Sequence, residues 1–266
     1  MSYLSPLMTL MLNGIKKATA SLDRDFSEIE RLQSSVKPYQ DFVRNAYGRI
    51  AQNLRIELGK IKPNALFIDS EVTNIPNQDC FLVRPVDALE NFSRGIALFA
   101  TTVVFCENGT PKATIIYNRV SDELYFAEKG NGAYKEGFRN QERLRVSANK
   151  EKSLALTSLM IGYDYGTPEF EKAAKKAVAF AANRRNFGSV AVSLASVAAG
   201  KCDLSVCWGT DFAATVAGLL LVKEAGGYVY DIDAKNIEPQ KLEDVLSAKN
   251  LVAANNNFGD LIKTLK

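Results

Sequence analysis

The feature that most constrains the fold is a series of strand-forming segments between Ile96 and Tyr134. These segments are rich in β-branched and aromatic residues or alternate in polarity. Turns that contain glycine and asparagine separate the first segment from the second and the third from the fourth. The strand segments are 96–106, 112–118, 123–128 and 133–134, and the turns are 107–109 and 130–132. Strands joined by such short turns pair antiparallel. The sequence therefore predicts one broad antiparallel sheet, a meander, with helices packed on it.

Helical patterns flank this region. Ser5-Pro6 is typical of a helix start, and the apolar spacing predicts helices over 6–21 and 41–61. After Ser153 strands and helices alternate, with strands expected at 154–162, 203–207, 228–231 and 251–254 and helices at 168–182, 188–199, 212–225 and 261–265. We therefore predict an N-terminal α+β half, 1–150, and a C-terminal α/β half, 151–266, that form one continuous structural unit.

Composition limits the classes of function. A chain of 266 residues with 47% hydrophobic residues buries a substantial core. A net charge of +3, without a dense run of Lys and Arg, gives no signal for direct nucleic-acid binding. We find no stretch long and apolar enough to span a membrane and no N-terminal export signal, so we expect a cytoplasmic protein. The four cysteines are scattered without a CxxC pair, which favours buried, reduced thiols.

The chain contains no histidine. This absence excludes Ser-His-Asp and Cys-His catalysis, imidazole metal ligands and imidazole acid–base chemistry. Any chemistry must therefore come from carboxylates, a bound metal, lysine, tyrosine or hydroxyl groups.

The stretch 81–92 contains the strongest candidate site. A short apolar strand, Phe81–Val83, turns at Arg84-Pro85 and places Asp87 just before a helix start. Many α/β proteins build metal and phosphate sites from a carboxylate delivered in this way. Arg84, however, lies three residues before Asp87, where a metal site needs a second anion.

Several motifs carry a resemblance over nearly the whole chain. They are Asp41-Phe42-Val43, Gly130-Asn131-Gly132-Ala133-Tyr134 with Leu144-Arg145-Val146-Ser147, Gly188-Ser189 with Val197-Ala198-Ala199-Gly200 and Asp203, and LVKEAGG at Leu221–Gly227. Together they resemble the motifs of the inositol monophosphatase family, including its bacterial extragenic suppressor proteins. The resemblance implies an α/β (α+β) fold, a layered αβαβα sandwich of the sugar and inositol phosphatase type that is usually a homodimer.

The resemblance also implies Mg²⁺-dependent hydrolysis of inositol or sugar monophosphates. Magnesium requires near-octahedral oxygen ligation, and two or three ions activate a water and hold the phosphate. At the ligand positions of the family this chain keeps Glu71 and Asp87. The lost ligand positions are Tyr47, Ser70, Arg84 and Ala214. Leu89 replaces the threonine that helps to activate the water, so no residue is assigned as catalytic. These replacements predict a weak or absent magnesium site and a catalytically impaired relative.

Asp211 has two interpretations. A local shift of register would make it a substitute for the aspartate lost at Ala214. Alternatively, Asp211 caps the helix that starts at Phe212. The sequence leaves both open.

Phosphate binding is a separate question. Backbone N–H groups at Ala88, Leu89, Gly188 and Ser189 lie near helix starts, which attract anions, and Arg84 adds a positive charge. Alternatively, Arg84 pairs with Asp87 or Glu71 and holds a remnant pocket closed. The sequence therefore allows an impaired phosphatase or a non-catalytic binding protein. Two ligands are then possible for a non-catalytic binding protein. By analogy with extragenic suppressor relatives, the ligand is a protein of the transcription machinery. Alternatively, the ligand is an anionic metabolite.

Overall fold

The computed structural model describes residues 4–32, 40–137, 140–161, 167–168, 171, 175, 183–231, 235–248 and 250–258. The helices are α1 (Pro6–Ala18), α2 (Leu22–Leu32), α3 (Gln40–Ile61), α4 (Leu89–Ser93), a 3₁₀ turn at Lys152–Leu154, α6 (Val190–Ala198), α7 (Phe212–Glu224) and α8 (Leu242–Ala248). The strands of the first sheet are β1 (Leu66–Ile68), β2 (Cys80–Asp87), β3 (Ala100–Glu107), β4 (Thr110–Asn118), β5 (Glu123–Glu128), β6 (Gly132–Glu136) and β7 (Gln141–Arg143). Those of the second are β8 (Leu156–Ile161), β9 (Asn183–Arg185), β10 (Leu204–Trp208), β11 (Tyr228–Asp231) and β12 (Asn250–Ala254).

The first sheet runs in chain order from β1 to β7. Every pair from β2 to β7 is antiparallel, which confirms the predicted meander. The expectation that the whole sheet is antiparallel was wrong at its edge, because β1 runs parallel to β2. A parallel neighbour needs a long return connection, and the irregular segment 69–79 provides it.

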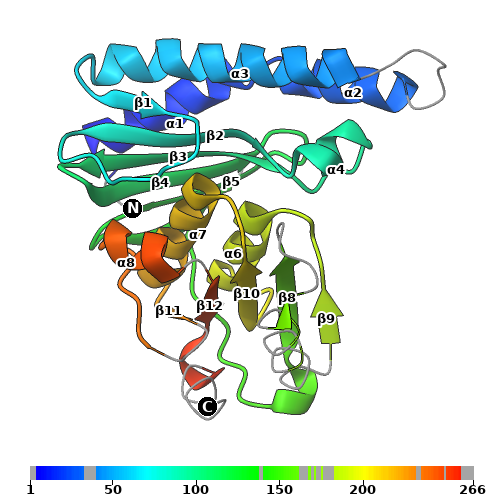
Figure 1. The fold of residues 1–266 in the computed structure, drawn as a ribbon, viewed down its shortest axis with the longest axis vertical. Coiled ribbons are helices and arrows are strands. Elements are labelled where there is room, and N and C mark those ends of the chain that lie inside the picture. The colour runs from blue at the N-terminus through cyan, green and yellow to red at the C-terminus, as the bar shows by residue number, and fades with distance from the viewer. Residues whose placement is uncertain are drawn as a thin grey trace.

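The elements stack in layers (Figure 1). Helices α1 and α3 cover one face of the first sheet, and α6 and α7 lie between the two sheets. The second sheet has the order β11-β12-β10-β8-β9, in which β10, β8 and β9 are parallel. This arrangement confirms the mixed α/β class and its layered architecture. The helices expected at 168–182 and 261–265 lie largely outside the described residues.

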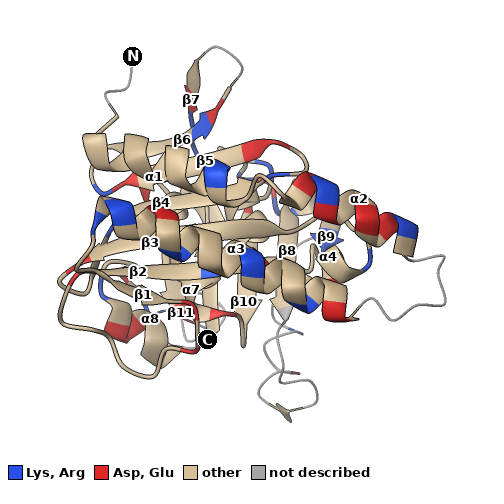
Figure 2. Ribbon diagram, turned by 90° about the horizontal axis from the view of Figure 1, so that it is seen from above, with Lys and Arg blue, Asp and Glu red and all other residues tan. Residues whose placement is uncertain are grey.

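The outer helical layer begins as the sequence predicts and then differs. The Ser5 hydroxyl accepts a hydrogen bond from the Met8 amide at 3.0 Å, and Pro6 follows it. The helix predicted over 6–21 is present, but it ends earlier, at Ala18. The following helix α2 was not predicted. The Thr19 hydroxyl donates to the Ile15 carbonyl at 2.7 Å, at the point where the helix ends. Both basic and acidic residues occur along α2 and α3 (Figure 2).

Helix α7 is the central element of the layer between the sheets. Its residues 213–222 are all buried, as expected for a helix that contacts protein on every side. At Gly218 a Cβ atom would lie 2.4 Å from Cβ of Leu194, so α7 and α6 touch at this point. Within the described ranges, no helix meets the length and hydropathy that a membrane span requires.

Two buried or partly buried carboxylates join sequence motifs that lie far apart in the chain. The Glu224 carboxylate, at the end of α7, accepts hydrogen bonds from the amides of Gly130 (2.9 Å) and Gly132 (3.0 Å). The Asp203 carboxylate accepts from the Ser147 hydroxyl and from the Leu156 amide, the latter at 2.8 Å. The Glu224 bonds and the Asp203–Ser147 bond join the region before residue 150 to the region after it. One apolar cluster also contains residues of both sheets.

Candidate functional site

The end of strand β2 is bent by a bulge. Arg84 pairs with Thr102 and Asp87 with Ala100, so two residues of β2 lie opposite one residue of β3. Pro85 occupies the bulge, and its carbonyl accepts a hydrogen bond from the buried Thr101 hydroxyl at 2.7 Å. Proline has no N–H to donate to the neighbouring strand, so it is tolerated at a bulge, where the ladder of hydrogen bonds is interrupted. A bulge also changes the direction of the side chains that follow it.

The bulge brings Asp87 to the beginning of α6. Oδ2 of Asp87 accepts hydrogen bonds from the Ser189 hydroxyl (2.5 Å) and the Ala191 amide (2.9 Å). The Ser189 hydroxyl in turn accepts from the Val192 amide at 3.0 Å. Donors at the start of α6 are therefore already bonded to protein side chains. The sequence suggested the neighbouring backbone N–H groups of Gly188 and Ser189 for an anion, and it did not indicate that Asp87 binds the start of α6.

Asp87 is held in an environment that disfavours its charge. Burial raises the pKa of Asp87 to about 6. The hydrogen bonds from Ser189 and Ala191 act in the opposite direction, as does Arg84, whereas the charge of Asp211 adds to the increase. The carboxylate is therefore partly protonated near pH 6.

Arg84 contacts residues from two other elements. Its Nη1 lies 3.4 Å from Oδ2 of Asp211, and its guanidinium carbon lies 5.8 Å from the centre of the Tyr47 ring on α3. Burial raises the pKa of Tyr47, and the charges of Arg84, Asp211 and Asp69 also act on it. The structure therefore brings Tyr47, Arg84, Asp87 and Asp211 together at one end of β2.

Asp211 also caps α7. Its Oδ1 accepts a hydrogen bond from the Ala214 amide at 2.9 Å, which confirms the capping interpretation. Ala214 itself is fully buried in the helix. One carboxylate thus holds the start of α7 with one oxygen and Arg84 with the other.

Replacing Asp211 separates these two roles. Asp211→Ala removes the cap and the ion pair, and we expect it to lower the free energy of unfolding by about 1–2 kcal/mol. Asp211→Asn is the matched control, since asparagine caps as well as aspartate and a partly exposed ion pair contributes only about 0.5 kcal/mol. Urea unfolding measures both. Equal losses in the two variants would show that the ion pair, and not the cap, matters.

The other candidate residues are placed differently. Glu71 is exposed in the segment 69–79, and no hydrogen bond or ion pair joins it to another described residue; Ser70 is also exposed. Leu89 begins α4 and packs into the apolar core beneath the outer helices. Ala88 adopts φ 61° and ψ 58°, a left-handed conformation that costs an alanine about 1 kcal/mol or more.

Asn91 is a residue at the site that the sequence did not indicate. Its side-chain amide donates to the carbonyls of Phe187 (2.7 Å) and Leu98 (2.6 Å). A Cβ on Gly188, which has φ +72°, would lie 2.7 Å from this amide nitrogen. Asn91 thus positions α4 against the turn before Ser189. A polar residue inside a short predicted helix was the only signal for it.

The donor set does not fit a magnesium ion. A positive charge stands beside Asp87 and is paired with Asp211, and the Oδ2 atom of Asp87 is already bonded to α6. In the part of the chain that the structure describes, no group of three or more Asp, Glu, Cys or His side chains is arranged to hold a metal.

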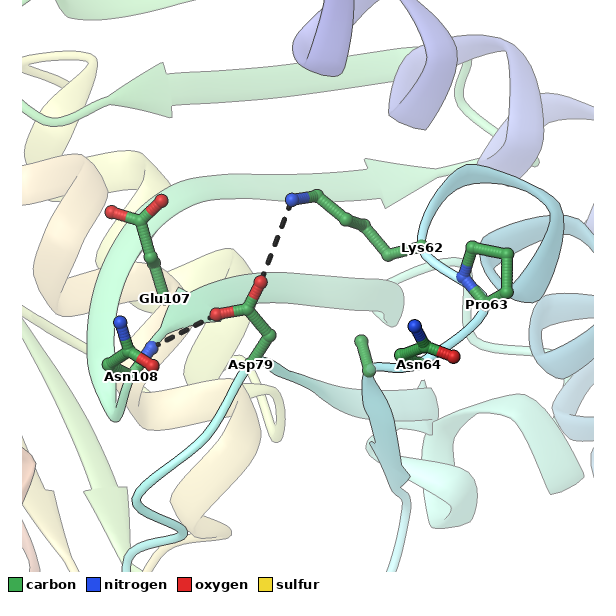
Figure 3. A pocket seen from close by; sticks show the side chains of 7 residues that line it. Lys62, Pro63, Asn64, Asp79, Glu107 and Asn108 are labelled. Carbon is green, nitrogen blue, oxygen red and sulfur yellow. Dashed lines mark hydrogen bonds and ion pairs between the residues drawn. The ribbon is translucent and has the colours of Figure 1, made fainter.

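A separate open hollow of about 540 Å³ lies at the opposite end of β2 (Figure 3). Its lining residues are Lys62, Pro63, Asn64, Ala65, Asp79, Glu107 and Asn108. Asp79 lies 3.6 Å from Lys62 Nζ and accepts from the Asn108 amide at 3.2 Å. Asp79 directly precedes β2, whereas Asp87 is the last residue of that strand. The hollow and the Arg84 site therefore lie at opposite ends of β2, and they have no residue in common.

Comparison with known proteins gives consistent matches. The sequence profile of the inositol monophosphatase family matches residues 4–266. An inositol-1-monophosphatase of Mesorhizobium japonicum is 34% identical over 264 residues, which cover 94% of this chain and 92% of that protein. The Nus factor SuhB of Haemophilus influenzae is 25% identical over 94% of this chain and 92% of that protein. The crystal structure of the extragenic suppressor protein suhB from Bartonella henselae superposes with a TM-score of 0.80 at 29% identity and covers 99% of both chains.

Proposed function

This chain belongs to the inositol monophosphatase family, and we propose that it is a member with impaired phosphatase activity that acts chiefly by binding. The observation that carries the proposal is the ion pair between Arg84 and Asp211. Arg84 stands where the resemblance puts a ligand aspartate. A guanidinium has no lone pair for a metal ion and stays protonated at any ordinary pH. Its charge therefore opposes a cation where the family binds magnesium.

The remaining acids support the same proposal. Glu71 is exposed and makes no contact with the other candidates, and Asp87 is buried with its pKa raised to about 6. Leu89 offers no hydroxyl to position a water. In this proposal Glu71 and Asp87 are remnants of the metal site, and Asp211 is a helix cap and counter-ion. Magnesium is then bound weakly or not at all.

We propose that the ligand is a protein. Some relatives are named Nus factor SuhB, which supports a partner from the transcription machinery; homodimer formation is proposed on the resemblance alone. The geometry supports binding of a phosphate-bearing ligand less well. Arg84 is already paired with Asp211, and donors of α6 are bonded to Asp87 and Ser189. An anion at Arg84, Ala88, Leu89, Gly188 and Ser189 would have to displace Asp211.

The test is phosphate release from inositol monophosphate with and without Mg²⁺. We expect no magnesium-dependent release above that of the Asp87→Asn variant, because the residues that the structure describes contain no group of three or more acids arranged to hold a metal. Turnover that magnesium stimulates and Asp87→Asn abolishes would overturn the proposal.

A second measurement separates the two kinds of ligand. Titration calorimetry with inorganic phosphate compares the wild type with Asp211→Asn. We expect no measurable binding to the wild type and a gain in the variant, because Arg84 then loses its counter-ion. Tight phosphate binding by the wild type would favour the anionic-metabolite alternative over a protein partner.

A further inference from the structure

Two cysteines of the first sheet lie directly opposite each other. Cys80 is the first residue of β2, and its register partner on the antiparallel strand β3 is Cys106. Directly opposite residues of such strands have Cα atoms about 4.5 or 5.5 Å apart. A disulfide spans Cα separations of about 4.4–6.8 Å. Both arrangements therefore allow a disulfide without a large movement of the backbone.

The two thiols interact already in the reduced state. Both are free and completely buried. A hydrogen bond from Cys106 lowers the pKa of Cys80, and the same contact raises the pKa of Cys106. The other two cysteines provide a contrast. Cys207, on β10, has Met160 and Leu251 as register partners, and Cys202 precedes that strand.

The chain on either side of this pair borders an open hollow and an irregular segment. The hollow of Figure 3 is lined by Asp79 and Glu107, the chain neighbours of Cys80 and Cys106. The segment 69–79 contains no helix or strand. It packs on the turn after β3, where a Cβ on Gly109 would lie 2.9 Å from the Pro76 carbonyl. Segments without regular backbone hydrogen bonds open locally at a lower free energy than sheet strands.

We propose that Cys80 and Cys106 are a redox-active pair that forms a reversible cross-strand disulfide with a hydroperoxide as oxidant. The Cys80 sulfur attacks one peroxide oxygen, the O–O bond breaks, and a sulfenic acid and one water (or alcohol) result. The Cys106 sulfur then attacks the sulfenic sulfur, the S–O bond breaks, and its proton leaves with the oxygen as water. Two thiols thus lose two electrons and two protons to the peroxide. A dithiol reverses the reaction by exchange.

The disulfide closes a loop that contains the candidate site. Arg84, Asp87 and all of α4 lie between Cys80 and Cys106 in the chain. Cross-linking the ends of this segment limits the unfolded chain more than the folded one, so the oxidised protein resists unfolding better. The proposal is independent of whether the protein hydrolyses phosphate.

The test treats the protein with hydrogen peroxide under native conditions, then unfolds it in denaturant and alkylates the remaining thiols, because all four cysteines are buried in the fold. We expect a loss of two hydrogens in the intact mass, two alkylated cysteines, and a peptide that links Cys80 to Cys106 and disappears with dithiothreitol. The thermal midpoint should rise by about 5–10 °C on oxidation. The double variant Cys202→Ala/Cys207→Ala should behave in the same way.

Other results would overturn the proposal. Four alkylated cysteines after treatment, or addition of oxygen atoms in place of loss of hydrogens, would show that the pair does not couple. A linked peptide that contains Cys202 or Cys207 would assign the chemistry elsewhere. Cys106→Ala should abolish the linked peptide. The wild-type peptide map decides the question even if that variant folds poorly.

Discussion

Asp87→Asn is expected to raise the free energy of unfolding by about 3 kcal/mol at pH 8 and to leave it unchanged below pH 4. The folded-state pKa of Asp87 is about 6, whereas the ordinary value is 3.8. Because the raised pKa means that the folded state binds the proton more tightly, ionisation of Asp87 destabilises the fold as the pH rises through this window. Each pKa unit corresponds to about 1.4 kcal/mol.

Asparagine has the shape of the neutral carboxyl group and carries no charge to lose. Its side-chain oxygen accepts from Ser189 and Ala191 as Oδ2 of Asp87 does. Urea unfolding of both proteins at intervals between pH 4 and 8 measures the effect, and the other carboxyl groups cancel in the difference. A difference that is independent of pH, or that increases toward low pH, would contradict the environment described for Asp87.

Gly218→Ala is expected to lower the free energy of unfolding by about 3 kcal/mol. The new Cβ would lie 2.4 Å from both Cβ and Cδ1 of Leu194, which is closer than atoms in a packed core approach. The contact is between two buried helices in the central layer, so α6 or α7 must move. Overpacking of this kind costs about 1–3 kcal/mol and occasionally more.

Gly48→Ala is the matched control for this prediction. Gly48 is exposed in α3, and a Cβ there would meet no atom within 4 Å. We expect this variant to gain about 1 kcal/mol from helix propensity alone. In the double variant Gly218→Ala/Leu194→Gly the loss should be smaller than the sum of the single losses, because removal of the Leu194 side chain, Cβ included, removes the clash. An additive double variant would show that the two residues do not oppose each other.

The sequence predicted the architecture because its signals are local and repeated. Strand-forming segments with short turns predicted β3 to β6, an apolar run predicted part of β2, and the serine-proline pair predicted the start of α1, whereas β7 was not predicted. Helix α2 was missed although its buried residues Leu22, Phe26 and Ile29 recur at helical spacing. The parallel pairing of β1 was missed because the direction in which two strands pair has no local signal here. The capping role of Asp211 was predicted as one of two alternatives, since a cap needs only the residues that follow it.

At the candidate site the sequence predicted the residues but not the contacts that they make. From the sequence alone, the motif positions predicted which residues stand there, including the positive charge at Arg84 and the replacement of ligand acids that the resemblance implies. Only the tertiary structure decided their partners: Asp211 for Arg84, the start of α6 for Asp87, and Cys106 for Cys80. These contacts depend on a bulge in β2, on strand register and on the docking of α6 and α7. The three contacts join residues that lie apart in the chain. No local pattern of residues indicates which of these residues will meet in the fold.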